Sequence, residues 1–230
     1  MRSTVIILLC MLIVGDRLFA QSIPRLMEKH YKAHNQPFWE QINTISADVE
    51  WTSEIGVFHA EFMAKEPRMV MIKSVKDRFI EANDGEQNWT LAAWTKEEVS
   101  EMELERAFIL NNLMSFGSPL PDGDHLTFRG MVEVDQRRCE WIEWADDSRK
   151  EEHFIDHRTH LLYKSVITEQ FGDETITLTR TVNKYRAFNG IQFPTIIKMR
   201  TNTFESDYVF DGIVLGEGIP SSRFSKPDEL

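Results

Sequence analysis

The sequence predicts an α+β fold that is mostly β: a long antiparallel curved sheet, a half-open β-barrel of about ten strands, closed by two or three helices. Three observations support this. Apolar residues recur at every second position over much of the chain from residue 45 onward. Turn signals such as Asn83-Asp84-Gly85 and Phe188-Asn189-Gly190 separate these stretches. Helical periodicity is confined to two regions, so a meander is favoured over alternating βαβ units.

The first twenty residues have the layout of a secretory signal peptide. Arg2 precedes an apolar run over residues 5–14, and small or neutral residues lead up to Ala20. The run is too short to span a bilayer as a mature helix. We expect cleavage after Ala20 (signal peptide 1–20), export to the periplasm, and one soluble domain over residues 21–230.

Charge and cysteine content narrow the function classes. The formal net charge is −11, which argues against binding to nucleic acid or to anionic lipid surfaces. Beyond the leader the chain has one cysteine, Cys139, so no internal disulfide is expected. Cys139 lies in RRCEWIEW, a predicted strand, where a small buried residue is expected. No cofactor motif is present, and none is predicted.

Two helical pieces are predicted before the sheet. Pro24 suits a first helical turn, and Leu26 and Tyr31 lie among charged residues of the same segment. Asn35-Gln36-Pro37 interrupts this helix, and a second short piece over residues 38–42 leads into the sheet.

Strict alternation then predicts half-buried strands with one dry face. The apolar positions of four of them are Ile45, Ala47, Val49 and Trp51; Phe58, Ala60, Phe62 and Ala64; Leu126, Phe128, Val132 and Val134; and Ile176 and Leu178.

One strong helix is predicted inside the sheet region. Thr95 and Glu98 have the spacing of a capping box, and Phe116-Gly117-Ser118-Pro119 ends the segment. Between them, Val99, Met102, Ile109, Leu110 and Leu113 recur at helical spacing. We expect this helix to cover the dry face of the sheet.

Three local patterns, in this order, carry a resemblance to a known family. They are FHAEFMAKEPRMVMIKS with Lys65-x-Pro67, RFIEANDGEQNWTLAAW with Asp84-Gly85 and Trp89, and NKYRAFNGIQFPTIIKMR with Tyr185 and Phe193-Pro194. The closing RFSKP fits the same frame. With a signal peptide in front, the chain resembles the bacterial lipoprotein-localisation superfamily of the carrier LolA and the acceptor LolB, over nearly all of residues 24–227. The resemblance is that of a LolA-like relative, not of the carrier LolA itself.

The resemblance implies a half-open barrel around an apolar cavity that holds the acyl chains of lipoproteins or other lipids. It implies transfer toward the outer membrane, donor or acceptor proteins at the inner or outer membrane, and no enzymatic activity. The cavity residues expected from it are Phe58, Phe62, Val70, Ile72, Ile80, Trp89, Leu91, Leu110, Leu113, Leu126 and Phe128. Each of these positions is equally expected in an ordinary packed core.

One position departs from the family pattern. In LolA the residue before the proline of Lys-x-Pro is an arginine that helps to latch the lid, and this chain has Glu66 there. The LolA latch is therefore not carried over to this chain.

Two other functions remain open at this stage. One is an envelope sensor or scaffold similar to RseB, which acts through a protein partner. The other is an exported hydrolase with a dispersed active site, although no nucleophile elbow, phosphate loop or dinucleotide fingerprint is present.

The segment HFIDHRTHLLYK raises the hypothesis of a metal site, because His153, His157 and His160 fall within it. A catalytic zinc site needs three converging ligands, and no His-Glu-x-x-His motif or cysteine pair supports one. Asp156 and Thr159 favour a turn, so a solvated hairpin with His157 at its tip is the preferred interpretation, and no metal is predicted.

Overall fold

The computed structural model describes residues 22–66, 68–92, 99–113, 120 and 125–227. The helices within these ranges are α2 (Ser22–His34), α3 (Gln36–Trp39), α4 (Leu104–Asn111) and the 3-10 helix η2 (Ser221–Arg223). The strands are β1 (Thr44–Ser53), β2 (Gly56–Lys65), β3 (Met69–Ser74), β4 (Phe79–Asn83), β5 (Asn88–Ala92), β6 (Val99–Glu101), β7 (Thr127–Val134), β8 (Arg137–Ala145), β9 (Arg149–Asp156), β10 (Leu162–Phe171), β11 (Glu174–Phe188), β12 (Ile191–Arg200) and β13 (Glu205–Leu215). The expected solvated turn between β9 and β10 is present, and the second helical piece lies slightly earlier than predicted.

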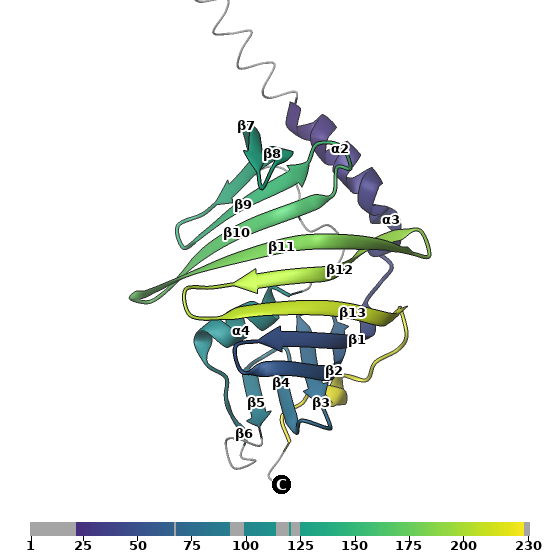
Figure 1. Cartoon of the computed structure of the whole chain (residues 1–230), viewed down its shortest axis with the longest axis vertical. Coiled ribbons are helices and arrows are strands. Elements are labelled where there is room, and N and C mark those ends of the chain that lie inside the picture. Colours follow the sequence, from purple (N-terminus) through teal and green to yellow (C-terminus); the bar gives the residue numbers. More distant parts are fainter. Residues whose placement is uncertain (1–21, 67, 93–98, 114–119, 121–124, 228–230) are drawn as a thin grey trace, which may run out of the picture.

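All the described strands form one antiparallel sheet in the order β6-β5-β4-β3-β2-β1-β13-β12-β11-β10-β9-β8-β7. Two meanders, β1–β6 and β7–β13, are joined where β1 pairs with β13. The sheet is curved and stays open, with β6 and β7 as its two edges (Figure 1). The predicted fold class is confirmed. The sheet has more strands than expected because short strands such as β6 carry too few residues to show an alternating pattern.

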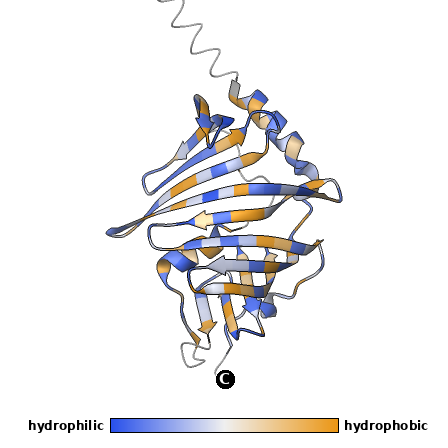
Figure 2. Ribbon diagram, in the orientation of Figure 1, coloured by the Kyte–Doolittle hydropathy of each residue, from blue (hydrophilic) through white to orange (hydrophobic). Residues whose placement is uncertain are grey.

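Alternation explains most strands. In β1 the side chains of Ile45, Val49 and Trp51 are buried, whereas those of Asp48 and Glu50, on the opposite face, are exposed. Figure 2 shows the resulting change of hydrophilic and hydrophobic residues along the strands. One parity therefore faces the concave side of the sheet, where the helices lie.

A bulge in β7 changes this parity. Phe128 pairs with the buried Ile142, but the register shifts before Gly130, and Val132 then pairs with Cys139. Because Cys139 and Ile142 lie on opposite faces of β8, Val132 faces away from Phe128. The expectation that these residues share one face was wrong, since Gly130, at φ +127, inserts an extra residue into the strand. Cys139 is buried in its strand, as predicted.

The internal helix is shorter than predicted. Thr95 and Glu98 lie outside the described residues, and Val99 belongs to β6, where it pairs with Leu91 of β5. The described helix begins only at Leu104. Pairing with a sheet edge thus takes precedence over a helical spacing that few residues carry.

In the arm formed by β2–β5, the concave face is buried, and so is the part of the convex face that lies under the chain after β13. Its convex face carries a cluster of Met63, Met71, Ala82, Trp89 and Phe224, which we call the strap cluster. The chain after β13, residues 216–227, covers this cluster as a C-terminal strap. The Trp89 Nε1–H donates a hydrogen bond to the carbonyl oxygen of Phe224 (3.1 Å), and Lys65 Nζ donates to the carbonyl oxygen of Ile219 (2.9 Å). The RFSKP segment thus closes the outer side of the sheet.

Candidate functional site

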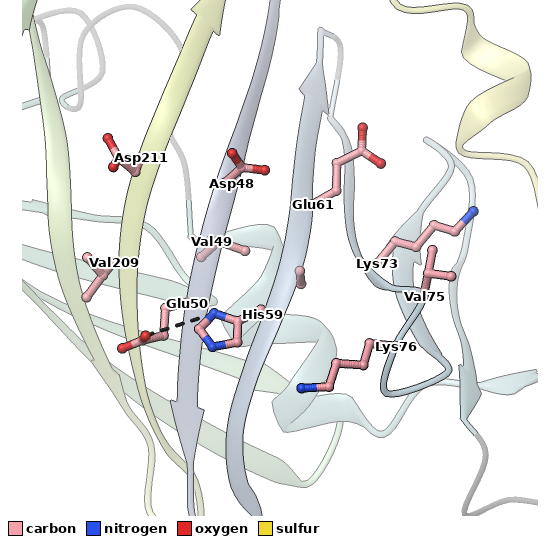
Figure 3. Close-up of a pocket in the computed structure, with 11 residues that line it drawn as sticks. Asp48, Val49, Glu50, His59, Glu61, Lys73, Val75, Lys76, Val209 and Asp211 are labelled. Atoms are coloured by element: carbon pink, nitrogen blue, oxygen red, sulfur yellow. Dashed lines mark ion pairs between the residues drawn. The ribbon is translucent and has the colours of Figure 1, made fainter.

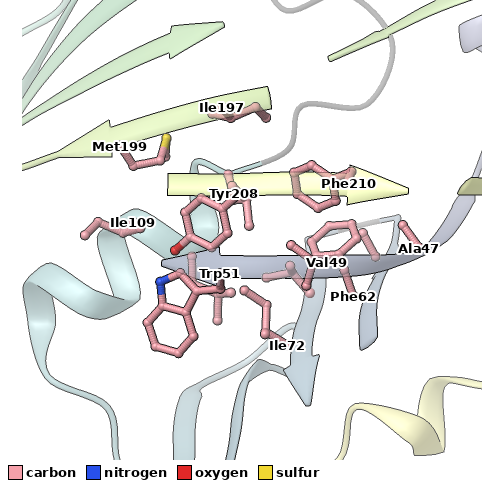
Figure 4. Packing of buried hydrophobic residues seen from close by; sticks show 14 of the residues in the cluster. Ala47, Val49, Trp51, Phe62, Ile72, Ile109, Ile197, Met199, Tyr208 and Phe210 are labelled. Carbon is pink, nitrogen blue, oxygen red and sulfur yellow. The ribbon is translucent and has the colours of Figure 1, made fainter. Parts of the chain in front are cut away.

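The concave face of the sheet holds a large apolar cluster, which we call the interior cluster. Trp51, Phe62, Tyr208 and Phe210 form its centre, with the rings of Trp51 and Tyr208 stacked at 6.4 Å and those of Phe62 and Phe210 at an edge-to-face 5.2 Å (Figure 4). Residues from β1–β5, β10–β13, α3 and α4 contribute to it. The interior is therefore an aromatic-rich apolar surface supplied by both meanders.

Helix α4 covers part of this surface through its buried residues 107–110. Polar contacts attach it to the sheet. Arg106 forms an ion pair with Glu81 of β4, and its guanidinium lies 4.6 Å from the centroid of the Trp51 ring. At the other side of the helix, the Glu105 carboxylate accepts hydrogen bonds from the hydroxyls of Thr201 and Thr203. The cover is thus held by directional contacts at its two sides.

A row of polar side chains crosses the concave face of β9–β11. His153, Ser165 and Arg180 are neighbours in the strand register and are all buried. Ser165 Oγ lies 3.0 Å from His153 Nδ1, and the Glu151 carboxylate lies 3.0 Å from His153 Nε2. Arg180 donates a hydrogen bond to the carbonyl oxygen of Asn112, just after α4 (3.1 Å). This polar belt separates the interior cluster from the apolar residues under α2.

Electrostatics keep the belt in defined protonation states. Burial alone would raise the pKa of Glu151, but the hydrogen bond from His153 and the nearby Arg149 guanidinium lower it below its usual range. Burial lowers the pKa of His153. His153 therefore stays neutral beside an ionised Glu151, which also pairs with Arg149 at 2.6 Å. The expectation that His153 belongs to a wet hairpin was wrong, because its side chain points to the concave face.

Helix α2 lies over the β7–β9 end of the concave face (Figure 1). Leu26 and Met27 pack with Leu126, Ile142 and Ile155 in a third cluster, the helix cluster. Further along α2, two buried histidines replace the apolar residues, and they contact residues of β11 and of the β9–β10 turn.

The structure brings six of the eleven expected cavity residues together. Phe62, Val70, Ile72, Leu110 and Leu113 belong to the interior cluster, and Phe58 packs against it.

The other five lie elsewhere. Ile80, Trp89 and Leu91 are placed by the strand register on the convex face, in or against the strap cluster. Leu126 is in the helix cluster and Phe128 packs against it. Alternation separates the two faces of a strand, but it does not show whether the second face is also covered. The sequence signal for burial on both faces was the uninterrupted apolar run of residues 69–72.

A surface depression of about 640 Å³ lies on the convex face, where β13, β1, β2 and β3 meet. Asp211, Asp48, Glu61 and Lys73 follow one another across β13, β1, β2 and β3, and Lys76 lies just after β3 (Figure 3). Its walls are charged and open to solvent, so it does not suit an acyl chain.

No group of three or more histidine, cysteine, aspartate or glutamate residues in the described part of the chain is arranged to hold a metal ion. His157, instead of approaching His153, places its Nδ1 2.7 Å from the carboxylate of Glu140. Across the described ranges, no helix combines the length and the apolar character needed to cross a membrane. The predicted signal peptide lies outside the described residues.

Comparison with known proteins supports the fold. No protein-family model matches the chain, and no curated protein matches its sequence. A LolA superfamily protein from Nitrosomonas europaea, 13% identical, aligns over 87% of this chain and 97% of its own with a TM-score of 0.57. A DUF1329 family protein from Desulfovibrio piger, 10% identical, aligns over 87% of this chain and 97% of its own with a TM-score of 0.54. The chain therefore has a LolA-type fold.

Proposed function

We propose that this chain, with its LolA-type fold, is an exported binder of lipoprotein acyl chains or other lipids, which it holds in its apolar interior for transfer toward the outer membrane. The observation that carries the proposal is the interior cluster: an aromatic-rich concave surface that both meanders supply and that a separate helix covers. Its donors and acceptors would be proteins of the inner or outer membrane.

The energetics define what such a binder must provide. Transfer of an acyl chain from a membrane to water costs about 0.8 kcal/mol of free energy for each CH₂ group, so a chain of sixteen carbons costs roughly 12 kcal/mol. Only apolar burial of comparable size offsets this loss. The function requires no bond-making chemistry, and the arrangement of the interior residues agrees with a role in binding.

We assign the acyl-binding surface to the six expected residues that share the concave face: Phe58, Phe62, Val70, Ile72, Leu110 and Leu113. Leu110 lies on α4, whereas Phe62 and Ile72 lie on the sheet below it. An acyl chain that contacts both surfaces requires α4 to move away from the sheet. The contacts of Arg106 and Glu105 then act as the latch of this cover, in place of the family's arginine, for which this chain has Glu66.

The test is native mass spectrometry of the exported protein, purified without detergent, followed by titration with a dansyl-labelled undecanoic acid. Stoichiometric lipid in the purified protein, or saturable probe fluorescence, is the expected result. Phe58→Gln places an amide at the edge of the interior cluster and should weaken probe binding about tenfold or more, because a buried aromatic side chain is worth 1.5–3 kcal/mol or so.

The matched control is Val57→Gln, on the same strand but facing outward, where the side chain is 57% exposed. It should bind the probe like the unmodified protein. A lipid-free protein that takes up no acyl probe, or equal loss of binding in the two variants, would contradict the proposal.

A further inference from the structure

The docked face of α2 is unusual in composition. Leu26, Met27, His30 and His34 follow one another at helical spacing, and all four are buried. His30 is 0% exposed and His34 is 3% exposed. Two of the four buried residues of this helix are therefore histidines, whose imidazole is well solvated by water and gains a charge in mild acid.

The surroundings of both histidines suit the neutral form, because the buried Nε2 atoms of His30 and His34 have no hydrogen-bond partner among the described residues. His30 Nδ1 lies 2.8 Å from the carbonyl oxygen of His160. Because a carbonyl oxygen only accepts hydrogen bonds, Nδ1–H is the donor, and this one contact acts to raise the pKa of His30. A second proton on Nε2 would be buried without an acceptor among the described residues. The His34 ring lies edge-on to His30 at 4.6 Å and to Tyr185 of β11 at 5.6 Å.

The groups around the two histidines do not favour a positive charge. Burial is the main cause that lowers the pKa of His30, and the neighbouring imidazoles of His153 on β9 and His160 in the β9–β10 turn supply no negative charge to offset it. From β11, the buried Arg180 and the phenol of Tyr185 lie on the same concave face.

The remaining elements that pack on α2 add little compensation. The buried polar side chain of β12 is Thr195, and the described residues of β7 include no buried polar or charged group. On α2 itself, the neighbouring ring is Tyr31, 6.1 Å from His30. Of the carboxylates of β8 and β9, the half-buried Glu151 is already shared by His153 and Arg149, and the buried Glu140 lies 2.7 Å from His157 Nδ1.

The chain also provides a hinge. Asn35, with φ 58 and ψ 52, separates α2 from α3 in the left-handed region. Beyond it, α3 is fixed by Trp39, whose buried ring stacks on Phe193 of β12 at 6.0 Å. No strand pairing of the described sheet runs through α2, so the helix can leave the sheet while α3 and all the strand pairs stay in place.

We propose that α2 is an acid-released cover of the concave face: neutral His30 and His34 hold it on the sheet, and protonation of the two side chains frees it to swing about Asn35. Release uncovers the helix cluster and the polar belt. If the proposed function holds, it also opens a path for a bound acyl chain to leave, so acid would couple to cargo release.

The direction and size of the effect follow from linkage. Burial lowers the pKa of His30 to about 4 and that of His34 to about 2. In the open state both imidazoles meet water and recover an ordinary pKa of about 6.5, so the open state binds protons preferentially below that pH. Between pH 7 and pH 5, each histidine should shift the equilibrium toward opening roughly 20-fold, and the two together about 500-fold.

Hydrogen–deuterium exchange of the full exported chain tests this proposal. After correction for the intrinsic pH dependence of exchange, peptides covering residues 22–34 should lose protection by about 500-fold from pH 7 to pH 5. Peptides from β11–β13 should keep theirs. Equal protection of α2 at the two pH values would overturn the proposal, and so would simultaneous loss of protection in α2 and the strands.

Variants separate the two histidines from other acid effects. The double variant His30→Gln/His34→Gln should keep α2 closed at pH 5, because glutamine stays neutral and can donate to the His160 carbonyl. If it folds poorly, His34→Phe keeps a ring beside Tyr185 and should remove about half of the logarithmic response. The matched control is His59→Gln, at an exposed position of β2, which should respond like the unmodified protein. A full response in His34→Phe would overturn the proposal.

The acyl probe distinguishes this inference from the proposed function. Probe release at pH 5 that disappears in the double variant supports both. Opening of α2 in a protein that binds no acyl probe at any pH contradicts the proposed function and leaves the acid-released cover standing. Probe binding without any opening of α2 at pH 5 supports the proposed function and contradicts the acid-released cover.

Discussion

The ion pair between Arg106 and Glu81 gives the sharpest stability prediction. The Arg106 side chain is 14% exposed and that of Glu81 is 9% exposed, and the pair ties α4 to β4. Arg106→Met keeps most of the apolar stem over Trp51 but removes the charge. The Glu81 carboxylate is then left buried without its cation.

The expected loss in the free energy of unfolding is about 3–5 kcal/mol, the range for one partner removed from a buried pair. Loss of the contact between the guanidinium and the Trp51 ring adds about 1 kcal/mol. The double variant Arg106→Met/Glu81→Leu removes both charges and should return to within roughly 1–2 kcal/mol of the unmodified protein, because an apolar pair often replaces a buried ion pair without loss.

Urea unfolding followed by tryptophan fluorescence measures these differences. A matched exposed pair, Arg200 and Glu205 (54% and 51% exposed), serves as the control, and Arg200→Met should lower the free energy of unfolding by less than about 1 kcal/mol. If Arg106→Met lowers it no more than Arg200→Met does, or if the double variant is as unstable as the single one, the role assigned to this pair is wrong.

Three further predictions concern the rest of the fold. Phe224→Ala should lower the free energy of unfolding by about 3–5 kcal/mol, because it empties the centre of the strap cluster; a loss near zero would show that the strap does not close the sheet. Burial raises the pKa of the Cys139 thiol to about 11. At pH 8 a thiol reagent should therefore label the native protein at least tenfold more slowly than the urea-unfolded protein, and equal rates would contradict the burial. Gly130→Ala should lower the free energy of unfolding by at least about 1 kcal/mol in the same urea assay, because φ +127 is strained for alanine even though a Cβ there meets no atom within 4 Å. An unchanged free energy of unfolding would refute the bulge.

The sequence predicted the sheet where a single rule controls a strand. β1 alternates over residues 45–51 and β2 over residues 58–62, so the buried faces of Ile45 and Phe62 followed directly. It did less well where a second surface covers the strand. Trp89 was assigned to a cavity on the concave side, but the strap, more than one hundred residues later in the chain, covers its actual face.

The polar contents of the concave face were outside the reach of pattern analysis. His30 and His160 are 130 positions apart, and neither segment carries a sequence pattern that predicts their contact. The HFIDHRTH segment forms the predicted hairpin between β9 and β10, but its local pattern does not show that His153 is buried beside Ser165 and Glu151. Local periodicity specifies the face of a strand, whereas the partner on that face is set by the tertiary arrangement.

The pairing of β1 with β13 has a consequence for how the chain folds. Ile45 meets Leu215, so the contact that unites the two meanders joins nearly the two ends of the described chain. Such a non-local pairing is slow, because the entropy of closing the long intervening loop must be lost before any contact forms. A chain that becomes free to fold from its N-terminus onward can complete β1–β6 early, but β1 then remains an unpaired edge, open to wrong partners, until the last strand arrives. The fold is therefore most exposed to aggregation in the interval before β13 is added.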